Sequence, residues 1–176
     1  MAEPTELAER IAALAARAAE RLRAAGVAAE TIGEYAPPHR RRWWFGTRPA
    51  RILAVGRGWR LGALVVTDDG RLLAGGETLR ARTPPPILGY TSESARERDE
   101  LRHAAIRGGA AEGETIHWGA SPVDPAALDG ASAPLAVRDG APVVRWAPRT
   151  PLAAATPLET YLDERTGLLA DPPAGA

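Results

Sequence analysis

Apolar residues recur along this chain with two different periods, and the first of them predicts a helix near the N-terminus. Between residues 5 and 25 an apolar side chain returns every three or four positions, which places these side chains on one helical face. The members of this stripe are Leu7, Ile11, Leu14, Ala18 and Leu22. Pro4 suits a first helical turn and Gly26 suits a stop. We predict an amphipathic helix within residues 1–26 that docks on the chain or, as an alternative, pairs with another helix.

The second period is two residues long and predicts strands. Residues 59–66 alternate in this way, and Asp68-Asp69-Gly70 supplies a turn, so residues 51–81 are predicted to form a β-hairpin that is well buried. A second hairpin is predicted over residues 135–147, with its turn at Asp139-Gly140. Residues 114–120 are predicted to form a short strand.

Two further segments have helical character. Residues 94–107 begin with Ser94 and Glu97, which match a capping box, and Arg96 stands four positions before Glu100, where the two can pair. Residues 157–169 are predicted to form the last helix. In contrast, the prolines within residues 30–49 predict an irregular segment.

These elements predict an α+β fold. We expect an antiparallel sheet built from two β-hairpins and a short strand, with an N-terminal, a central and a C-terminal helix packed on it. All 176 residues suit a single domain. Its predicted parts are the helix at 1–26, a connector rich in Pro, Arg and Trp at 27–50, the sheet and helices at 51–170, and a tail at 171–176.

Composition narrows the possible classes of protein. The chain has no Cys, which excludes disulfides and thiolate chemistry. All 22 basic residues are Arg, and Lys, Asn and Gln are absent, a bias typical of high-GC bacterial genomes. The formal net charge is zero, which argues against nonspecific binding of nucleic acid. The sequence has no membrane-spanning stretch and no signal peptide, so we expect a cytoplasmic protein without a membrane partner.

The segment between Glu34 and Asp68 has an unusual charge pattern, because it contains seven arginines and no acidic residue. Guanidinium groups clamp phosphate and aromatic rings stack on bases, while Trp and Arg also dominate protein interfaces. The segment therefore predicts a binding site for an anionic ligand or a partner, with the candidates Arg40, Arg41, Arg42, Trp43, Trp44 and Arg48. Alternatively, the tryptophans enter the core and the arginines pair with the acidic helices.

Candidates for catalysis are few. His103 and His117 could act as bases, with Glu93 as a carboxylate partner or Ser121 as a nucleophile. A site of two histidines and one carboxylate is conceivable if helix and strand converge. No two histidines have the spacing of a metal-ligand pair, however, so we predict neither a metal nor a cofactor.

These observations leave three hypotheses for function. The absence of a complete catalytic motif favours a small, non-catalytic interaction or accessory protein that binds another protein or itself. The arginine-rich segment supports an alternative, an Arg-dependent binder of a nucleotide, a phosphometabolite or single-stranded nucleic acid. The third hypothesis is a small hydrolase that depends on His and Glu.

Overall fold

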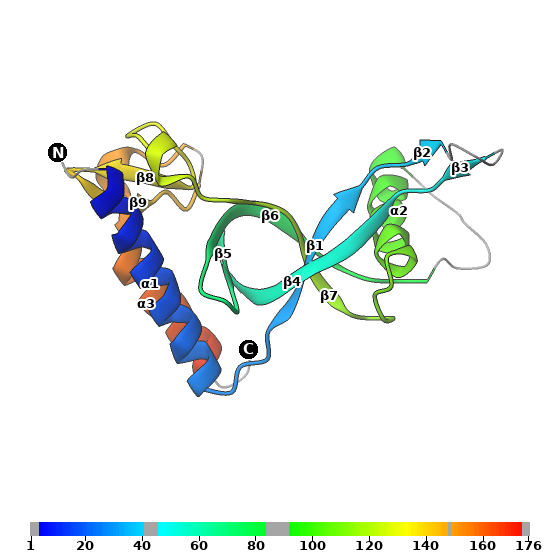
Figure 1. The fold of residues 1–176 in the computed structure, drawn as a ribbon, viewed down its shortest axis with the longest axis horizontal. Helices are drawn as coiled ribbons and strands as arrows, with labels where there is room; N and C mark the ends of the chain where they lie inside the picture. Colours follow the sequence, from blue (N-terminus) through cyan, green and yellow to red (C-terminus); the bar gives the residue numbers. More distant parts are fainter. Residues whose placement is uncertain (1–3, 41–45, 84–91, 148, 174–176) are drawn as a thin grey trace. The chain divides into compact units, whose positions relative to one another are not determined.

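The computed structural model describes residues 4–40, 46–83, 92–147 and 149–173, and it has an α+β fold. The chain forms two compact units (Figure 1). Unit 1 comprises residues 1–29, 58–75 and 120–176, and unit 2 comprises residues 30–57 and 76–119. The sequence predicts one domain, which requires both units to unfold together, and this stays a prediction.

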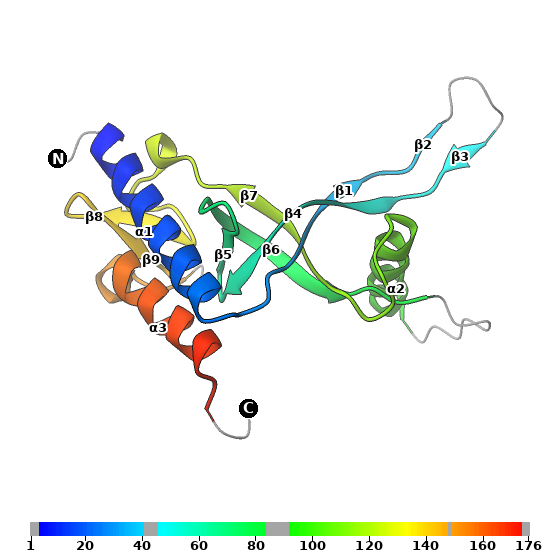
Figure 2. The same cartoon turned by 60° about the horizontal axis from the view of Figure 1, so that its bottom comes forward.

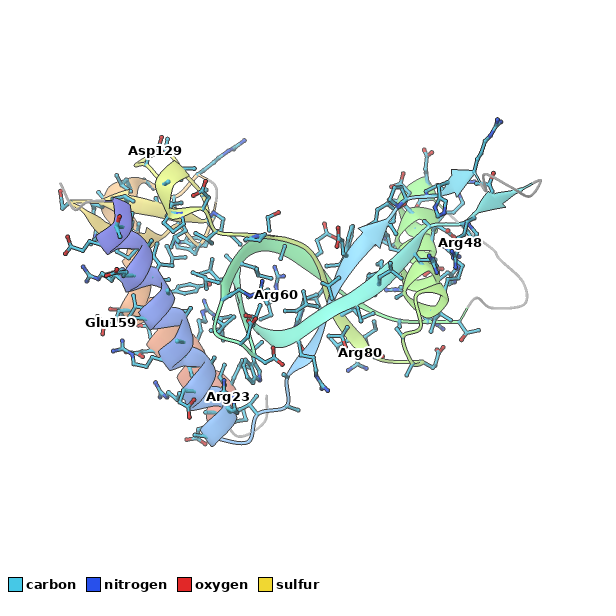
Figure 3. All side chains as sticks on the ribbon, viewed as in Figure 1. Arg23, Arg48, Arg60, Arg80, Asp129 and Glu159 are labelled. Atoms are coloured by element: carbon cyan, nitrogen blue, oxygen red, sulfur yellow. The ribbon has the colours of Figure 1, made fainter. Side chains whose placement is uncertain are left out.

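Two helices of unit 1 lie side by side (Figures 1 and 2): α1, Pro4–Ala24, and α3, Leu158–Ala170. All members of the predicted stripe on α1 are buried, which confirms the amphipathic face and its docking within the chain. Arg17 of α1 donates to Glu159 of α3 over 2.6 Å (Glu159 is labelled in Figure 3). The helix ends before Gly26, whose φ of +70° suits a residue without a Cβ.

Three antiparallel strands cross the region predicted to be one hairpin: β4, Arg51–Leu61; β5, Leu64–Thr67; and β6, Leu72–Arg80. The turn before Arg71 is where the sequence predicts it, and β5 is buried along its whole length. The prediction that the whole hairpin is well buried is wrong for β4, whose residues 53–57 are exposed. The prediction of one continuous strand over residues 59–66 is wrong, because the chain turns at Gly62, with φ of +65°. A residue without a Cβ adopts this conformation without steric cost.

Tyr161 of α3 fixes the turn at Gly62. Its hydroxyl donates to the carbonyl oxygen of Leu61 over 2.8 Å and accepts from the backbone N–H of Ala63 over 3.0 Å. A Cβ on Gly62 would lie 2.3 Å from the same hydroxyl oxygen. The turn therefore depends on a contact between residues about a hundred positions apart, which the local sequence does not reveal.

The second predicted hairpin is confirmed in unit 1. Strand β8, Leu135–Arg138, pairs with β9, Ala141–Val144, and Asp139 and Gly140 between them have φ of 52° and 74°. Two successive positive φ values are typical of the tight hairpin turn favoured by Asp-Gly. The short strand β10, Thr156–Pro157, extends this sheet along β9, and two 3-10 turns cover Pro125–Ala127 and Leu152–Ala154.

Arg138 on β8 and Arg145, which follows β9, donate hydrogen bonds to backbone carbonyl groups. Nη1 of Arg138 donates to the carbonyl oxygens of Leu152, Ala153 and Ala155 over 3.0–3.1 Å. Arg145 donates from Nε to the carbonyl oxygen of Thr150 and from Nη1 to three carbonyls of residues 130–132. Since a guanidinium carries five donors in a fixed plane, one side chain can hold a whole loop.

Unit 2 contains a parallel strand pair. Strand β1, Glu30–Ala36, pairs with β7, Thr115–Pro122, in a register that sets Ile32 beside His117. Hydrogen bonds join the large sheet in the order β1-β4-β5-β6-β7, so this sheet is mixed rather than purely antiparallel. The prediction that residues 30–49 are irregular is wrong for β1, and also for the short pair β2, His39–Arg40, and β3, Thr47–Arg48.

Helix α2, Glu93–Arg107, lies close to its predicted position in unit 2. Its N-cap is Ser92, which accepts from the N–H of Ala95, so the predicted capping role of Ser94 is wrong. Arg96 lies 3.9 Å from Glu93 rather than pairing with Glu100, which binds Arg107. The helix buries small side chains against β4 and β7 in a core of Ala50, Ile52, Ala81, Ala104, Ala105 and Ile116.

Helices long and apolar enough to cross a membrane were sought throughout the described residues, and none was found.

Candidate functional site

A groove of about 330 Å³ lies in unit 2 beside strands β6 and β7 and helix α2. The strands contribute exposed or half-buried side chains, and the helix contributes one face. Residues Arg98, Leu101 and Arg102 share that face because they stand three and four positions apart. The lining residues are Glu77, Thr78, Leu79, Arg80, Arg98, Leu101, Arg102, Thr115 and Trp118.

The groove is basic. Three arginines line it, Arg80, Arg98 and Arg102, together with one acidic residue, Glu77. Nη1 of Arg102 donates to Asp99 over 2.9 Å, whereas Arg80 and Arg98 form no ion pair with any described residue. Two cationic side chains thus face a cavity without a carboxylate partner in the described part of the chain, an arrangement that favours an anion.

A hydroxyl group in this groove is hydrogen-bonded to a buried histidine. Thr78 is an exposed residue of β6, and its Oγ1 lies 2.9 Å from Nδ1 of His117 on the neighbouring strand β7. The side chain of His117 is only 2% exposed. The buried imidazole therefore contacts a residue that lines the groove.

The other ring nitrogen of His117 faces a carboxylate. Its Nε2 lies 2.7 Å from Oε2 of Glu30, on β1, the strand that pairs with β7 on its other side. Because a carboxylate only accepts hydrogen bonds, Glu30 favours the tautomer with its proton on Nε2, in which Nδ1 accepts from the Thr78 hydroxyl. The 2.7 Å contact between Nε2 and Glu30 itself lacks hydrogen-bond geometry. Three adjacent strands thus bring together a carboxylate, an imidazole and a hydroxyl.

The other catalytic candidates predicted from the sequence do not join this cluster. His103 lies on α2 with its Nδ1 4.0 Å from Glu100, and its buried Nε2 has no hydrogen-bond partner among the described residues. The Glu93 side chain is 80% exposed and lies beside Arg96. Ser121 is exposed near the end of β7 and belongs to unit 1. Their catalytic roles stay predictions.

A metal site is likewise not found where the structure describes the chain. Neither an ion pair nor a hydrogen bond joins His103 to His117 among those residues. No group of three or more His, Asp or Glu side chains that could hold a metal occurs within residues 4–40, 46–83, 92–147 and 149–173.

The predicted arginine-rich binding segment is described only at its ends. Arg40 on β2 and Arg48 on β3 are both exposed, while Arg41, Arg42, Trp43 and Trp44 lie outside the described residues. Arg48 and Arg80 are labelled in Figure 3 and lie well apart within unit 2. The basic groove is therefore a different site from the segment predicted from the sequence.

A second groove of about 500 Å³ lies in unit 2 between β1 and α2. Its lining combines the apolar residues Ala50, Leu101 and Ala104 with Tyr35, Arg96, Glu97 and Glu100. Tyr35 is 40% exposed there, and its ring lies 6.1 Å from that of Trp118. Apolar side chains at this surface suit contact with an apolar partner rather than with an anion.

Glu114 joins β1 to the loop before β7, and its environment makes unit 2 sensitive to acid. The Thr31 hydroxyl donates to one carboxylate oxygen over 2.5 Å and the N–H of Ala111 to the other over 2.8 Å. Hydrogen bonds from Thr31 and Ala111 lower the pKa of this carboxyl below its ordinary value.

A carboxyl group with a lowered pKa stabilises the folded state above its unfolded pKa of about 4.3 and loses that contribution as pH falls through the folded pKa. We expect Glu114→Gln to lower Tm at pH 7, and the difference from the wild type to shrink between pH 5 and pH 3. Melting curves over this range test the prediction. A Tm difference that stays constant down to pH 3 would contradict it.

No protein family, curated protein or solved structure with which the chain was compared matches it. The function is therefore argued from the side chains of unit 2 and their chemistry.

Several residues of the candidate site escaped the sequence analysis, namely Glu30, Thr78, Arg80, Arg98 and Arg102. The sequence contains one signal for the basic side of this site. Arg98 and Arg102 stand four positions apart in a predicted helix, so their side chains must share a helical face. Glu30 was missed because β1 was assigned as irregular. Nothing in the local sequence marks Thr78, since its contact with His117 spans 39 positions.

Proposed function

We propose that this protein binds a small anionic ligand, one that carries a phosphate or carboxylate group, in the basic groove of unit 2. The observation that supports the proposal best is the pair Arg80 and Arg98, which line one cavity and have no acidic partner among the described residues. Arg102 adds a third guanidinium, although it shares its charge with Asp99.

The shape and lining of the groove favour a small molecule. Its volume of about 330 Å³ is at the lower end of the range for metabolite pockets. Guanidinium groups clamp phosphate and carboxylate oxygens with two parallel hydrogen bonds. The hydroxyl of Thr115 can donate to the same oxygens, and Trp118 supplies an apolar wall.

Thermal unfolding at low salt tests the proposal directly. Inorganic phosphate, pyrophosphate and ATP are added separately, and a ligand at about a hundred times its Kd stabilises the fold by about 2.7 kcal/mol, or a few degrees in Tm. We expect at least one of them to raise Tm, and Arg98→Gln and Arg80→Gln each to weaken its binding about 10-fold or more, because a charge-assisted hydrogen bond is lost.

Two control variants locate the site. Arg10→Gln removes an exposed arginine of α1 and should leave the ligand-induced rise in Tm unchanged. Arg48→Gln tests the segment predicted from the sequence, and a loss of binding in this variant but not in Arg98→Gln would assign the anion to that segment. No rise in Tm with any of the three anions would contradict the proposal.

The interaction role predicted from the sequence remains a second candidate. It is supported by the apolar groove beside Tyr35 and by Leu53 and Val55 on β4, which are 37% and 56% exposed. Exposed apolar side chains that cluster on one unit are typical of surfaces that contact another chain. A protein that sediments as a dimer and responds to no anion would favour this candidate.

A further inference from the structure

A second feature of the basic groove goes beyond binding. Thr78 lines the groove, its Oγ1 lies 2.9 Å from Nδ1 of His117, and Nε2 of the same ring lies 2.7 Å from Glu30. A hydroxyl, an imidazole and a carboxylate in this order form the set of groups that activates an oxygen nucleophile. We propose that Thr78 is the nucleophile of an esterase site.

Burial strengthens the case for activation of this hydroxyl. His117 is held between two strands with its side chain 2% exposed, so its ring orientation is fixed by Thr78 on one side and Glu30 on the other. A base that is already oriented toward its proton donor needs little reorganisation when the proton moves. Thr78 itself is an exposed residue and lines the groove.

The first step forms an acyl-threonine. Oγ1 of Thr78 attacks the carbonyl carbon of a carboxylic ester while its proton passes to Nδ1 of His117, and Glu30 stabilises the imidazolium through Nε2. The tetrahedral adduct then breaks its bond to the alcohol oxygen, which takes the proton from Nδ1. In the second step water gives a proton to Nδ1 and attacks the acyl carbon. The bond between that carbon and Oγ1 of Thr78 then breaks, and Oγ1 takes the proton back from Nδ1. Ester and water thus become acid and alcohol.

The lining of the groove defines the substrate class. Arg80 stands two positions after Thr78 on β6, so the two side chains leave the strand on the same face. An ester with a carboxylate or phosphate on its acyl or alcohol part can bind the guanidinium groups while its carbonyl carbon meets Thr78. This substrate class rests on the proposed anion site, whereas the nucleophile rests on the contacts of His117.

Intact-mass measurement after incubation with p-nitrophenyl acetate tests the nucleophile. We expect the wild-type chain to gain one acetyl group, mapped to Thr78 by peptide sequencing, and to release nitrophenolate. Thr78→Val should lower the rate by about 100-fold or more, since general-base catalysis contributes this much. Thr78→Ser should retain acylation, and Thr47→Val, at an exposed strand threonine outside the groove, should acylate at the wild-type rate.

The two remaining groups are tested by kinetics. Glu30→Gln should lower kcat for p-nitrophenyl hemisuccinate about 10-fold with an unchanged KM, because Glu30 positions and stabilises the base but does not touch the substrate. Arg98→Gln should raise KM for this anionic ester, because Arg98 lines the proposed anion site.

Failure of each proposal has a separate signature. Absence of acylation in the wild type, or acylation that persists in Thr78→Val, would overturn the nucleophile, and a phosphate-induced rise in Tm would still support the anion site. Acylation of Thr78 with no preference for the anionic ester would instead overturn the assigned substrate class.

Discussion

Replacing Gly108 with alanine should destabilise unit 2 by about 3 kcal/mol, the upper end of the usual cost of overpacking. This glycine ends α2 where the helix meets β4, and a Cβ there would lie 1.7 Å from the carbonyl oxygen and 2.7 Å from the carbonyl carbon of Ile52. Both obstacles are backbone atoms, so no rotamer change relieves the overlap. The helix would have to move away from the strand and open the core around Ala104 and Ala105.

The measurement is urea unfolding followed by circular dichroism, with Gly56→Ala as the control. Gly56 also lies in unit 2, on β4, but nothing stands within 4 Å of the position its Cβ would take. We expect this control to unfold within about 1 kcal/mol of the wild type, because it adds a methyl group to open space. A Gly108→Ala variant as stable as Gly56→Ala would show that α2 does not pack as closely on β4 as the structure shows.

Replacing Leu162 with alanine should destabilise unit 1 by about 2–5 kcal/mol. The side chain is 2% exposed on α3 and belongs to the core that joins α3 to α1 and to β5. Truncation removes apolar contact area and leaves a cavity, because closely packed neighbours relax only in part.

Leu168→Ala on the same helix is the matched control. This leucine is 51% exposed, so the same chemical change removes little buried surface and should cost less than about 1 kcal/mol. Urea midpoints of the two variants give the comparison. An equal loss of unfolding free energy in Leu162→Ala and Leu168→Ala would contradict the burial of one face of α3.

The elements that the sequence predicts well depend on local patterns. The stripe on α1, the Asp-Gly turn between β8 and β9 and the extent of α2 follow from side-chain periodicity and backbone preferences within a few residues. The predictions that are wrong depend on distant contacts. The turn at Gly62 is held by Tyr161, and β1 exists because it pairs with β7, more than eighty positions away.

The candidate site shows the same division. The sequence indicates that His117 is on a strand and that Arg98 and Arg102 share a helical face. Only the tertiary structure places Glu30 and Thr78 on the two strands that flank His117 and brings α2 beside them. The chemistry of each residue type is fixed by the sequence, but ion pairs and hydrogen bonds act over a few ångströms. Strand pairing between distant segments therefore decides which of these groups can act together.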